Sequence, residues 1–228
     1  LLLPNPDVMR RLLGVDADDE TCRRAHYAGM REVDRLGVAD WPAVDRVIAR
    51  AAGFPDDRLD DAVPLLDQLY VGGHEPWVPI AGAAEAMLAL EAAGYGLAIV
   101  SNAEGTMEAQ LADGRVCSVD GGSVAKVAVV VDSHVVGIEK PDPRIFSLAL
   151  DALGASPDRC IYVGDTVVFD VNGARAAGIA PIHIDPYGLC PDDDHPHAVS
   201  LAALADELCG GGGRESNPPD GDRPSHPL

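Results

Sequence analysis

The chain is predicted to fold as an α/β protein with a doubly wound parallel sheet that follows an N-terminal helical domain. Two patterns predict this class: helical spacing of apolar residues over residues 6–69, and alternating apolar strands and helices from residue 79 onward. Strands that are apolar at nearly every position indicate a sheet buried on both faces, as in parallel α/β folds.

The helical domain is expected over residues 1–75. Its apolar positions recur at helical spacing, glycines such as Gly14 and Gly37 mark helix ends, and β-branched residues cluster little. Acidic runs here are interpreted as solvated helix faces and loops. Four larger side chains could either pack in this domain or contact a substrate, and the sequence leaves that choice open: His26, Tyr27, Trp41 and Phe54.

The α/β domain is expected over residues 76–208. Strands are predicted at 96–101, 127–132, 160–163 and 181–184, and helices at 80–93, 105–112, 143–153 and 170–177. Polar residues end three of these strands: Ser101, Asp132 and Asp165. Because the carboxyl ends of parallel strands meet at one edge of a sheet, we expect these side chains to share one crevice.

The tail over residues 209–228 is rich in glycine and proline and lacks apolar anchors. It is expected to be disordered and without catalytic residues.

Two carboxylates, Asp165 and Asp170, stand five positions apart after the strand at 160–163. Mg²⁺ prefers oxygen ligands and keeps several waters, so one or two carboxylates plus substrate phosphate oxygens suffice. Asp165 could ligate directly, and Asp170 could ligate through water or orient the loop of Asp165. Read alone, the pair is equally consistent with a turn residue and a helix cap.

Two further segments carry groups that can bind phosphate. Ser101 and Asn102 end a strand, where a hydroxyl and backbone amides can form a phosphate cradle. Lys140 precedes the helix at 143–153, and its ammonium can neutralise a phosphoryl group. Taken alone, Ser101 is equally typical of a helix cap, and Lys140 of a surface lysine.

The order of these motifs resembles the haloacid dehalogenase-like (HAD) hydrolase superfamily. The resemblance covers roughly residues 79–185 and is specific only when the motifs are taken together. They are the strand followed by Ser101-Asn102, then Val136-Gly-Ile-Glu-Lys-Pro-Asp-Pro-Arg-Ile-Phe146, then Val163-Gly-Asp-Thr-Val-Val-Phe-Asp170 with the Gly-Ala-Arg-Ala-Ala-Gly178 that follows.

The resemblance implies a Rossmann-like, HAD-like core. It implies that Ser101 and Asn102 bind the substrate's phosphoryl oxygens, that Lys140 and Ser101 serve catalysis, and that Asp165 with Asp170 holds Mg²⁺. The helical domain would be the family's cap, which closes over the site, excludes water and selects the substrate.

The family's first motif has no counterpart before the helical domain. That motif is an Asp-x-Asp at the end of the first strand, and it supplies the aspartyl nucleophile. Leu1-Leu-Leu-Pro looks like the sequence that follows it, and Asp7 opens a predicted helix with no strand before it. In family members this strand lies between those at 96–100 and 160–163, so without it two rows of unpaired backbone groups would face each other. We therefore expect the chain as given to be an N-terminally incomplete version of an active enzyme.

The leading interpretation is a Mg²⁺-dependent phosphatase that acts on a small phosphorylated metabolite through an aspartyl-phosphate. A metal-free dehalogenase on the same scaffold is an alternative, but it would have no use for the carboxylates of Asp165 and Asp170. A non-catalytic pseudoenzyme, or a fragment that binds phosphate or metal, is another. The sequence indicates neither the substrate's identity nor the oligomeric state.

Charge and cysteine content narrow the partners and the compartment. A formal net charge of -20 disfavours binding to nucleic acid and to anionic membranes, and no apolar run reaches membrane-spanning length. The five cysteines are scattered without a C-x-x-C pair, which predicts neither a disulfide framework nor a zinc knuckle and favours a reducing cytoplasm.

One last segment, Asp192-Asp-Asp-His-Pro-His197 near Cys190, contains residue types that bind transition metals. It lies in a proline-rich stretch without evident paired ligands elsewhere. We therefore interpret it as an exposed polar turn.

Overall fold

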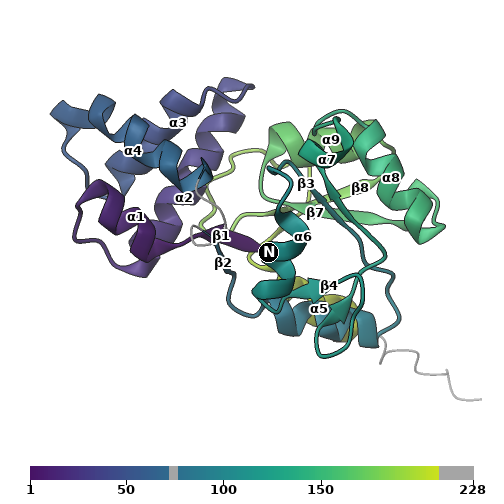
Figure 1. Cartoon of the computed structure of the whole chain (residues 1–228). Helices are drawn as coiled ribbons and strands as arrows, with labels where there is room; N and C mark the ends of the chain where they lie inside the picture. The colour runs from purple at the N-terminus through teal and green to yellow at the C-terminus, as the bar shows by residue number, and fades with distance from the viewer. Residues whose placement is uncertain (72–76, 211–228) are drawn as a thin grey trace, which may run out of the picture.

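The computed structural model describes residues 1–71 and 77–210, and Figure 1 shows a helical unit beside an α/β unit. Two short antiparallel strands, β1 (Leu2–Pro4) and β2 (Trp77–Pro79), pair where the chain enters and leaves the helical unit. Leu1 and Leu2 pack against the hydrophobic core of the α/β unit. The sequence pattern predicts neither strand, because three residues are too few for a visible alternation.

The helical unit has four described α-helices, and three of them begin at a side-chain cap. The Asn5, Asp18 and Asp40 side chains accept hydrogen bonds from backbone N–H groups at the starts of three helices. Gly14 and Gly37 end two of them with φ angles of 65° and 70°, which favour glycine. The elements are α1 (Pro6–Leu13), α2 (Asp19–Leu36), α3 (Trp41–Ala51), the 3-10 turn η1 (Asp56–Arg58) and α4 (Leu59–Val71).

One continuous hydrophobic core fills the helical unit, with Met9, Val33, Ile48 and Leu66 almost fully buried. Helices α2 and α3 approach closely at Gly29, where an added Cβ would lie 2.5 Å from an Ile48 side-chain carbon. Phe54 belongs to this core, so it packs inside the unit. Val168 and Phe169 of the α/β unit pack against the same core, and they join the two units.

The α/β unit alternates strands and helices as predicted, and two of the four predicted strands are shorter than expected. Its strands are β3 (Ile99–Ser101), β4 (Cys117–Ser118), β5 (Ala125–Lys126), β6 (Val130–Asp132), β7 (Ile161–Gly164), β8 (Ala180–Ile184) and β9 (His197–Ala198). Its helices are α5 (Ala83–Ala92), α6 (Met107–Asp113), α7 (Ser133–Val136), α8 (Arg144–Leu153), the 3-10 turn η2 (Pro157–Arg159), the π-helix η3 (Val167–Val171), α9 (Asn172–Ala176) and α10 (Leu201–Gly210).

Several of these elements differ from the sequence-based prediction, which has no counterpart for β4, β5, β9 or α7. The helix predicted to start at Asp170 starts earlier, as the π-helix η3, and α9 continues it. Helix α10 is absent from the prediction, although Ser200 accepts a hydrogen bond from Ala203 N at its start. Because α10 packs on α5 and reaches Gly210, the first two residues of the predicted disordered tail are helical. Residues 211–228 of that tail lie outside the described residues.

The sheet is covered on both faces, which confirms the doubly wound α/β class. Ile99 of β3 packs in a cluster with α5 and α6, whereas its neighbour Val100 packs in a second cluster with Phe146 of α8. Successive strand residues point to opposite faces, so helices must lie on both sides.

The sheet is divided into two parts. Within the described chain, β3 pairs only with β6, in parallel, and β7 pairs only with β8, which continues to β9. An open cavity of about 1720 Å³ is lined by both inner strands, including Ile99, Val100, Tyr162 and Val163. The structure therefore has the facing, mutually unpaired strand edges that the sequence predicts.

Two global features complete the fold. None of the described helices combines the length and the apolar character needed to cross a bilayer. All five cysteines are free.

Candidate functional site

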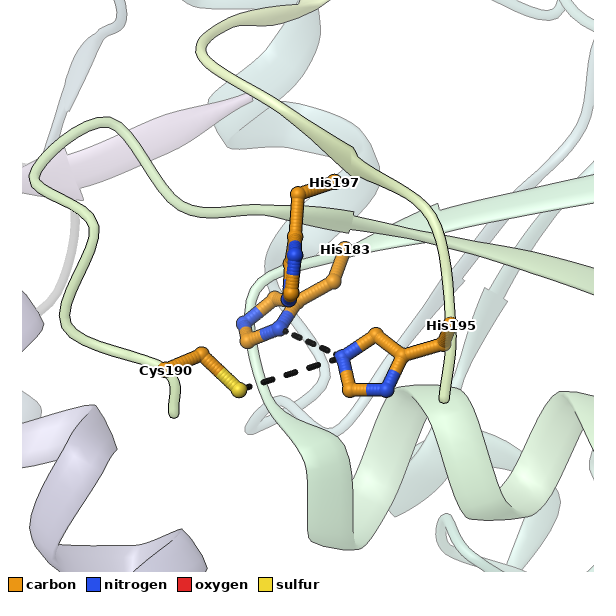
Figure 2. Close-up of side chains that lie close together, drawn as sticks. All are labelled: His183, Cys190, His195 and His197. Carbon is orange, nitrogen blue, oxygen red and sulfur yellow. Dashed lines mark hydrogen bonds between the residues drawn. The ribbon is translucent and has the colours of Figure 1, made fainter. Parts of the chain in front are cut away.

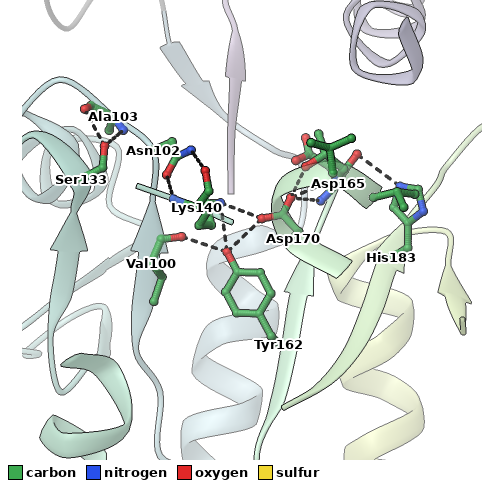
Figure 3. Close-up of polar contacts among 12 residues, drawn as sticks. Val100, Asn102, Ala103, Ser133, Lys140, Tyr162, Asp165, Asp170 and His183 are labelled. Atoms are coloured by element: carbon green, nitrogen blue, oxygen red, sulfur yellow. Dashed lines mark hydrogen bonds and ion pairs between the residues drawn. The ribbon is translucent and has the colours of Figure 1, made fainter. Parts of the chain in front are cut away.

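The predicted polar residues lie at the carboxyl ends of the strands, and Figure 3 shows Asp165 with its neighbours Asp170 and Lys140 there. Ser101 and Asp132 end β3 and β6 in direct register, and Asp165 follows the last residue of β7. Ser101 and Asp165 both line the cavity, together with Asn102, Lys140 and others. The expected crevice therefore exists, but its members have different roles.

Asp132 is a structural residue that holds the neighbouring loop. It is 5% exposed, and its carboxylate accepts hydrogen bonds from the backbone N–H groups of Gly105 (2.9 and 3.0 Å) and His134 (3.0 Å). Ser133 Oγ accepts from Ala103 N at 3.1 Å. These bonds fix the loop that follows β3, so Asp132 itself is not available to a ligand.

Ser101 and Asn102 differ in what they can bind. The Ser101 hydroxyl has no hydrogen-bond partner among the described residues, and Ser101 lines the cavity. The Asn102 side chain instead donates to the Lys140 carbonyl oxygen (3.0 Å) and accepts from Lys140 N (2.7 Å). Asn102 therefore fixes the backbone at Lys140, a role that the sequence does not predict.

Lys140 forms a buried ion pair with Asp170. Its Nζ donates to Asp170 Oδ1 at 2.7 Å and to the Tyr162 hydroxyl at 3.1 Å. Burial alone would lower the pKa of Lys140, but the charge of Asp170 outweighs it and raises that pKa above its ordinary value. The hydroxyl of Tyr162 also lies 3.0 Å from the Val100 carbonyl oxygen, so Tyr162 spans the divide between β7 and β3.

Asp170 has partners on both carboxylate oxygens. It is 3% exposed, and its Oδ2 accepts from Asp165 N (3.1 Å), Thr166 N (3.0 Å) and Thr166 Oγ1 (2.8 Å). A Cβ added at Gly164 would lie 2.3 Å from Asp170 Cγ, which explains why glycine precedes Asp165. Asp170 thus orients both Lys140 and the loop of Asp165, which was one of the two roles predicted for it.

Asp165 is the accessible carboxylate. Its side chain is 39% exposed, and its Oδ2 lies 3.8 Å from His26 Nε2, which belongs to α2 of the helical unit. Burial alone would raise the pKa of Asp165, but the contact with His26 and the charge of Lys140 hold it at about 2. Asp165 is therefore ionised at neutral pH and available to a cation.

The helical unit also holds the backbone next to this carboxylate. Asp34 of α2 accepts hydrogen bonds from Val167 N (2.8 Å) and Val168 N (2.9 Å), which are the first residues of η3. Burial raises the pKa of Asp34 to about 6, against the opposing effect of these two N–H groups. A contact between residues 133 positions apart gives no local sequence signal.

The segment interpreted as an exposed turn is exposed except at His195, which is buried, so the interpretation is wrong for that residue. His195 is 5% exposed, and its Nε2 lies 3.1 Å from Nδ1 of His183, which is 4% exposed. His183 comes from β8, and β9 pairs with β8 at His183 and His197. The prediction failed because the partner histidine lies twelve positions upstream, on a strand.

Comparison with known proteins identifies the class to which this fold and site belong. Residues 18–178 match the haloacid dehalogenase-like hydrolase family. The chain therefore belongs to this family, as its motifs indicate.

Individual relatives are phosphatases and HAD-like proteins. The chain is 41% identical over 115 residues to phosphoserine phosphatase of Thermus thermophilus, a match that covers 50% of this chain and 44% of that protein. It is 33% identical over 182 residues to haloacid dehalogenase-like hydrolase domain-containing protein 3 of Mus musculus, covering 74% and 69%. The match to phosphoserine phosphatase spans less than half of that protein's length.

A solved HAD phosphatase from Thermococcus onnurineus has a similar fold. The TM-score is 0.52 at 20% identity, and the match covers 86% of this chain and 94% of that one. The likeness extends through both the helical and the α/β unit.

Proposed function

We propose that the protein is a phosphatase that uses Mg²⁺ to hydrolyse the phosphate ester of a small metabolite. The proposal rests on one observation: Ser101, Lys140 and Asp165, from three separate segments, line one cavity at the strand ends. A hydroxyl, an ammonium and an ionised carboxylate can together bind, neutralise and position a phosphoryl group. The similarity to phosphoserine phosphatase supports a small phosphorylated substrate.

Each residue has a proposed role. Ser101 donates its hydroxyl proton to a phosphoryl oxygen, since no described residue occupies that hydroxyl. Lys140 balances the phosphoryl charge, and its position is fixed by Asp170 through its side chain and by Asn102 through its backbone. Asn102 is thus a positioning residue, and its side chain need not touch the substrate.

The carboxylates fit Mg²⁺. Asp165 offers an ionised, partly exposed carboxylate, and Mg²⁺ commonly takes one or two carboxylates and completes its shell with water and phosphate oxygens. Asp170 acts on this site indirectly, because both of its oxygens have protein partners. Mg²⁺ held at Asp165 would neutralise charge on the phosphoryl oxygens.

We propose an aspartyl nucleophile, as the family resemblance implies, and the open cavity between β3 and β7 supports a position for its carboxylate beside Lys140 and Asp165. The carboxylate would attack phosphorus and form an aspartyl-phosphate while the alcohol leaves with the bridging oxygen. Water would then cleave the acyl phosphate and release inorganic phosphate.

The helical unit is proposed to be a cap that selects the substrate. His26 and Trp41 of this unit line the cavity, and His26 lies beside Asp165. Tyr27, by contrast, is buried against Tyr187, and Phe54 lies in the cap core. We also propose a cytoplasmic location, which the five free cysteines support.

The test is hydrolysis of a panel of phosphate monoesters by the protein made from its full reading frame. We expect turnover that requires Mg²⁺ and is lost in EDTA, and Asp165→Asn to lose most of it without unfolding. Asp142→Asn, which alters an exposed surface ion pair, is the matched control and should keep full activity.

Three outcomes would replace the proposal. Unchanged turnover in Asp165→Asn would refute the metal assignment. Cleavage of a carbon–halogen bond that survives EDTA would favour the metal-free dehalogenase. Binding of phosphate without any turnover would favour a non-catalytic protein.

A further inference from the structure

Four side chains of the kinds that bind transition metals lie together beside the Asp165 loop (Figure 2). His183 comes from β8, His197 from β9, and Cys190 and His195 from the segment between them. One potential ligand atom of each lies within 4.8 Å of those of the other three. Imidazole nitrogen and thiolate sulfur are the ligands that Zn²⁺ prefers in proteins.

The hydrogen bonds around two of the histidines leave two lone pairs facing each other. His183 Nε2 lies 3.2 Å from the Asp165 carbonyl oxygen, and His195 Nδ1 lies 2.6 Å from the Asp194 carboxylate. Both partners can only accept, so each neutral ring carries its proton on that outer nitrogen. In two neutral rings the inner nitrogens, His183 Nδ1 and His195 Nε2, both present lone pairs, and they lie 3.1 Å apart. A cation between them would remove the repulsion.

The surroundings of His195 are those of a metal-bound histidine. Asp194 fixes the tautomer and the orientation of the His195 ring, as carboxylates commonly do behind a ligating imidazole. Arg175 in turn holds Asp194, donating to its carboxylate at 2.9 Å and to its carbonyl oxygen at 2.6 Å. The ring of His195 is thus aimed at the cluster before any metal binds.

The separations are close to those of a tetrahedral zinc site. Bond lengths of about 2.0–2.1 Å to nitrogen and about 2.3 Å to sulfur place neighbouring ligand atoms about 3.3 Å (N to N) and about 3.6 Å (N to S) apart. The observed distances are 3.1 Å between His183 Nδ1 and His195 Nε2, and 3.9 Å between Cys190 Sγ and His195 Nε2. Small side-chain rotations suffice to complete the shell, and His197, which is exposed, is free to make one.

We propose that His183, Cys190, His195 and His197 bind one Zn²⁺ in a closed, structural site. Four protein ligands leave no open position for a substrate, so the metal would stabilise rather than catalyse. It would tie β8, β9 and the segment between them together. Through His183 it would also steady the Asp165 carbonyl, and thus the loop that carries the proposed Mg²⁺ ligand.

The first test is the metal content of the full chain after growth with added zinc and thorough desalting. We expect one Zn²⁺ per chain by plasma mass spectrometry. Replacement by Co²⁺ should give visible absorption bands typical of tetrahedral cobalt and a thiolate-to-cobalt charge-transfer band in the near ultraviolet. Substoichiometric zinc together with no cobalt–thiolate band would overturn the proposal, and this measurement needs no variant.

Matched variants then assign the ligands. Cys190→Ser should abolish the charge-transfer band, and His195→Asn should lose most of the bound zinc. Cys209→Ser and His134→Asn alter an exposed cysteine and an exposed histidine outside the cluster, and both should keep full zinc content and the cobalt spectrum. A charge-transfer band that persists in Cys190→Ser, or is lost in Cys209→Ser, would contradict the assignment.

Discussion

The crevice around Asp170 and the cluster around His195 lie on two sides of the Asp165 loop, yet their polar groups are satisfied in opposite ways. Asp170 has protein donors on both oxygens, and its charge is balanced by Lys140. In the second cluster, His183 Nδ1 and His195 Nε2 lie 3.1 Å apart, and the other nitrogen of each ring already has a protein acceptor. The charges of the crevice are therefore balanced by protein groups, whereas in the cluster the proposed Zn²⁺ would bind between the two facing ring nitrogens.

The same difference explains which groups remain available in the crevice. Because Asp170 is fully engaged, Asp165 is the member of this carboxylate pair that is left for the proposed cation, and the Ser101 hydroxyl has no partner among the described residues. A framework of buried, paired groups positions a few exposed ones, which is the arrangement that preorganised sites require.

The largest expected effect comes from removing the charge that balances Lys140. Asp170→Ala leaves a buried ammonium unpaired and frees the N–H groups of the Asp165 loop, so we expect a loss of about 3–5 kcal/mol of unfolding free energy. Denaturant unfolding measures it. The matched control is Asp60→Ala, which breaks an exposed ion pair with Arg46 and should leave the stability nearly unchanged. Equal losses in the two variants would show that the buried pair has no special role.

Zinc removal should have the next largest effect, and only in the second cluster. A metal that binds the folded chain alone, at a hundredfold excess over its dissociation constant, stabilises by about 2.7 kcal/mol. We expect the unfolding temperature to rise with added Zn²⁺ in the metal-free wild type and to stay constant in Cys190→Ser. If Asp170→Ala also abolished the rise in unfolding temperature with Zn²⁺, zinc binding would depend on the Lys140–Asp170 pair, and the two sites would not be independent.

Gly164→Ala should perturb the crevice by crowding rather than by charge. The new Cβ would lie 2.3 Å from Asp170 Cγ, so Asp170 must move away from the loop of Asp165. We expect a loss of about 1–3 kcal/mol, as in other overpacked interiors. Stability unchanged in this variant would mean that Asp170 does not hold the loop tightly, and zinc content should be normal in either case.

Asp34 should give the smallest effect and a dependence on pH. Asp34→Ala removes the acceptor for two N–H groups of η3 and should cost about 1 kcal/mol, whereas Asp34→Asn keeps an acceptor and should cost less. Because the folded-state pKa of Asp34 is raised to about 6, the folded state binds the extra proton. The stabilisation that comes from this proton is therefore fully present below pH 3.8, the ordinary pKa of an aspartate. It is lost as the pH rises to about 6.

This pH effect can be isolated by following unfolding of the wild type and Asp34→Asn between about pH 4 and pH 7. The stability of Asp34→Asn relative to the wild type should increase across that window. A constant difference would show that Asp34 keeps an ordinary pKa in the folded protein.

The sequence could predict those features whose signal is local. Ser101, Lys140 and Asp165 stand at strand ends or before a helix, and parallel topology brings such positions to one edge. The alternation of strands and helices likewise predicted the doubly wound sheet, and the helical spacing predicted the segment that holds Phe54 in its core. Strand and helix ends were less well placed, since short strands give little periodicity.

The missed features depend on contacts between distant residues. Asp34 reaches η3 across 133 positions, and His183 meets His195 only because β8 and the segment after it fold back on each other. Nor could spacing show that Asp170 has no free oxygen, since that depends on Gly164 and Thr166 closing around it. In each case the partner is chosen by the tertiary fold.

The most direct test of the proposed division of roles is a Mg²⁺ titration of phosphate-ester turnover by the protein made from its full reading frame. It compares the wild type with Asp165→Asn, and the zinc content of both is measured. The wild type should gain turnover saturably with Mg²⁺, whereas Asp165→Asn should lose most of it at every concentration while keeping one zinc per chain and its unfolding temperature. Turnover that is independent of Mg²⁺, or unchanged in Asp165→Asn, would contradict the account.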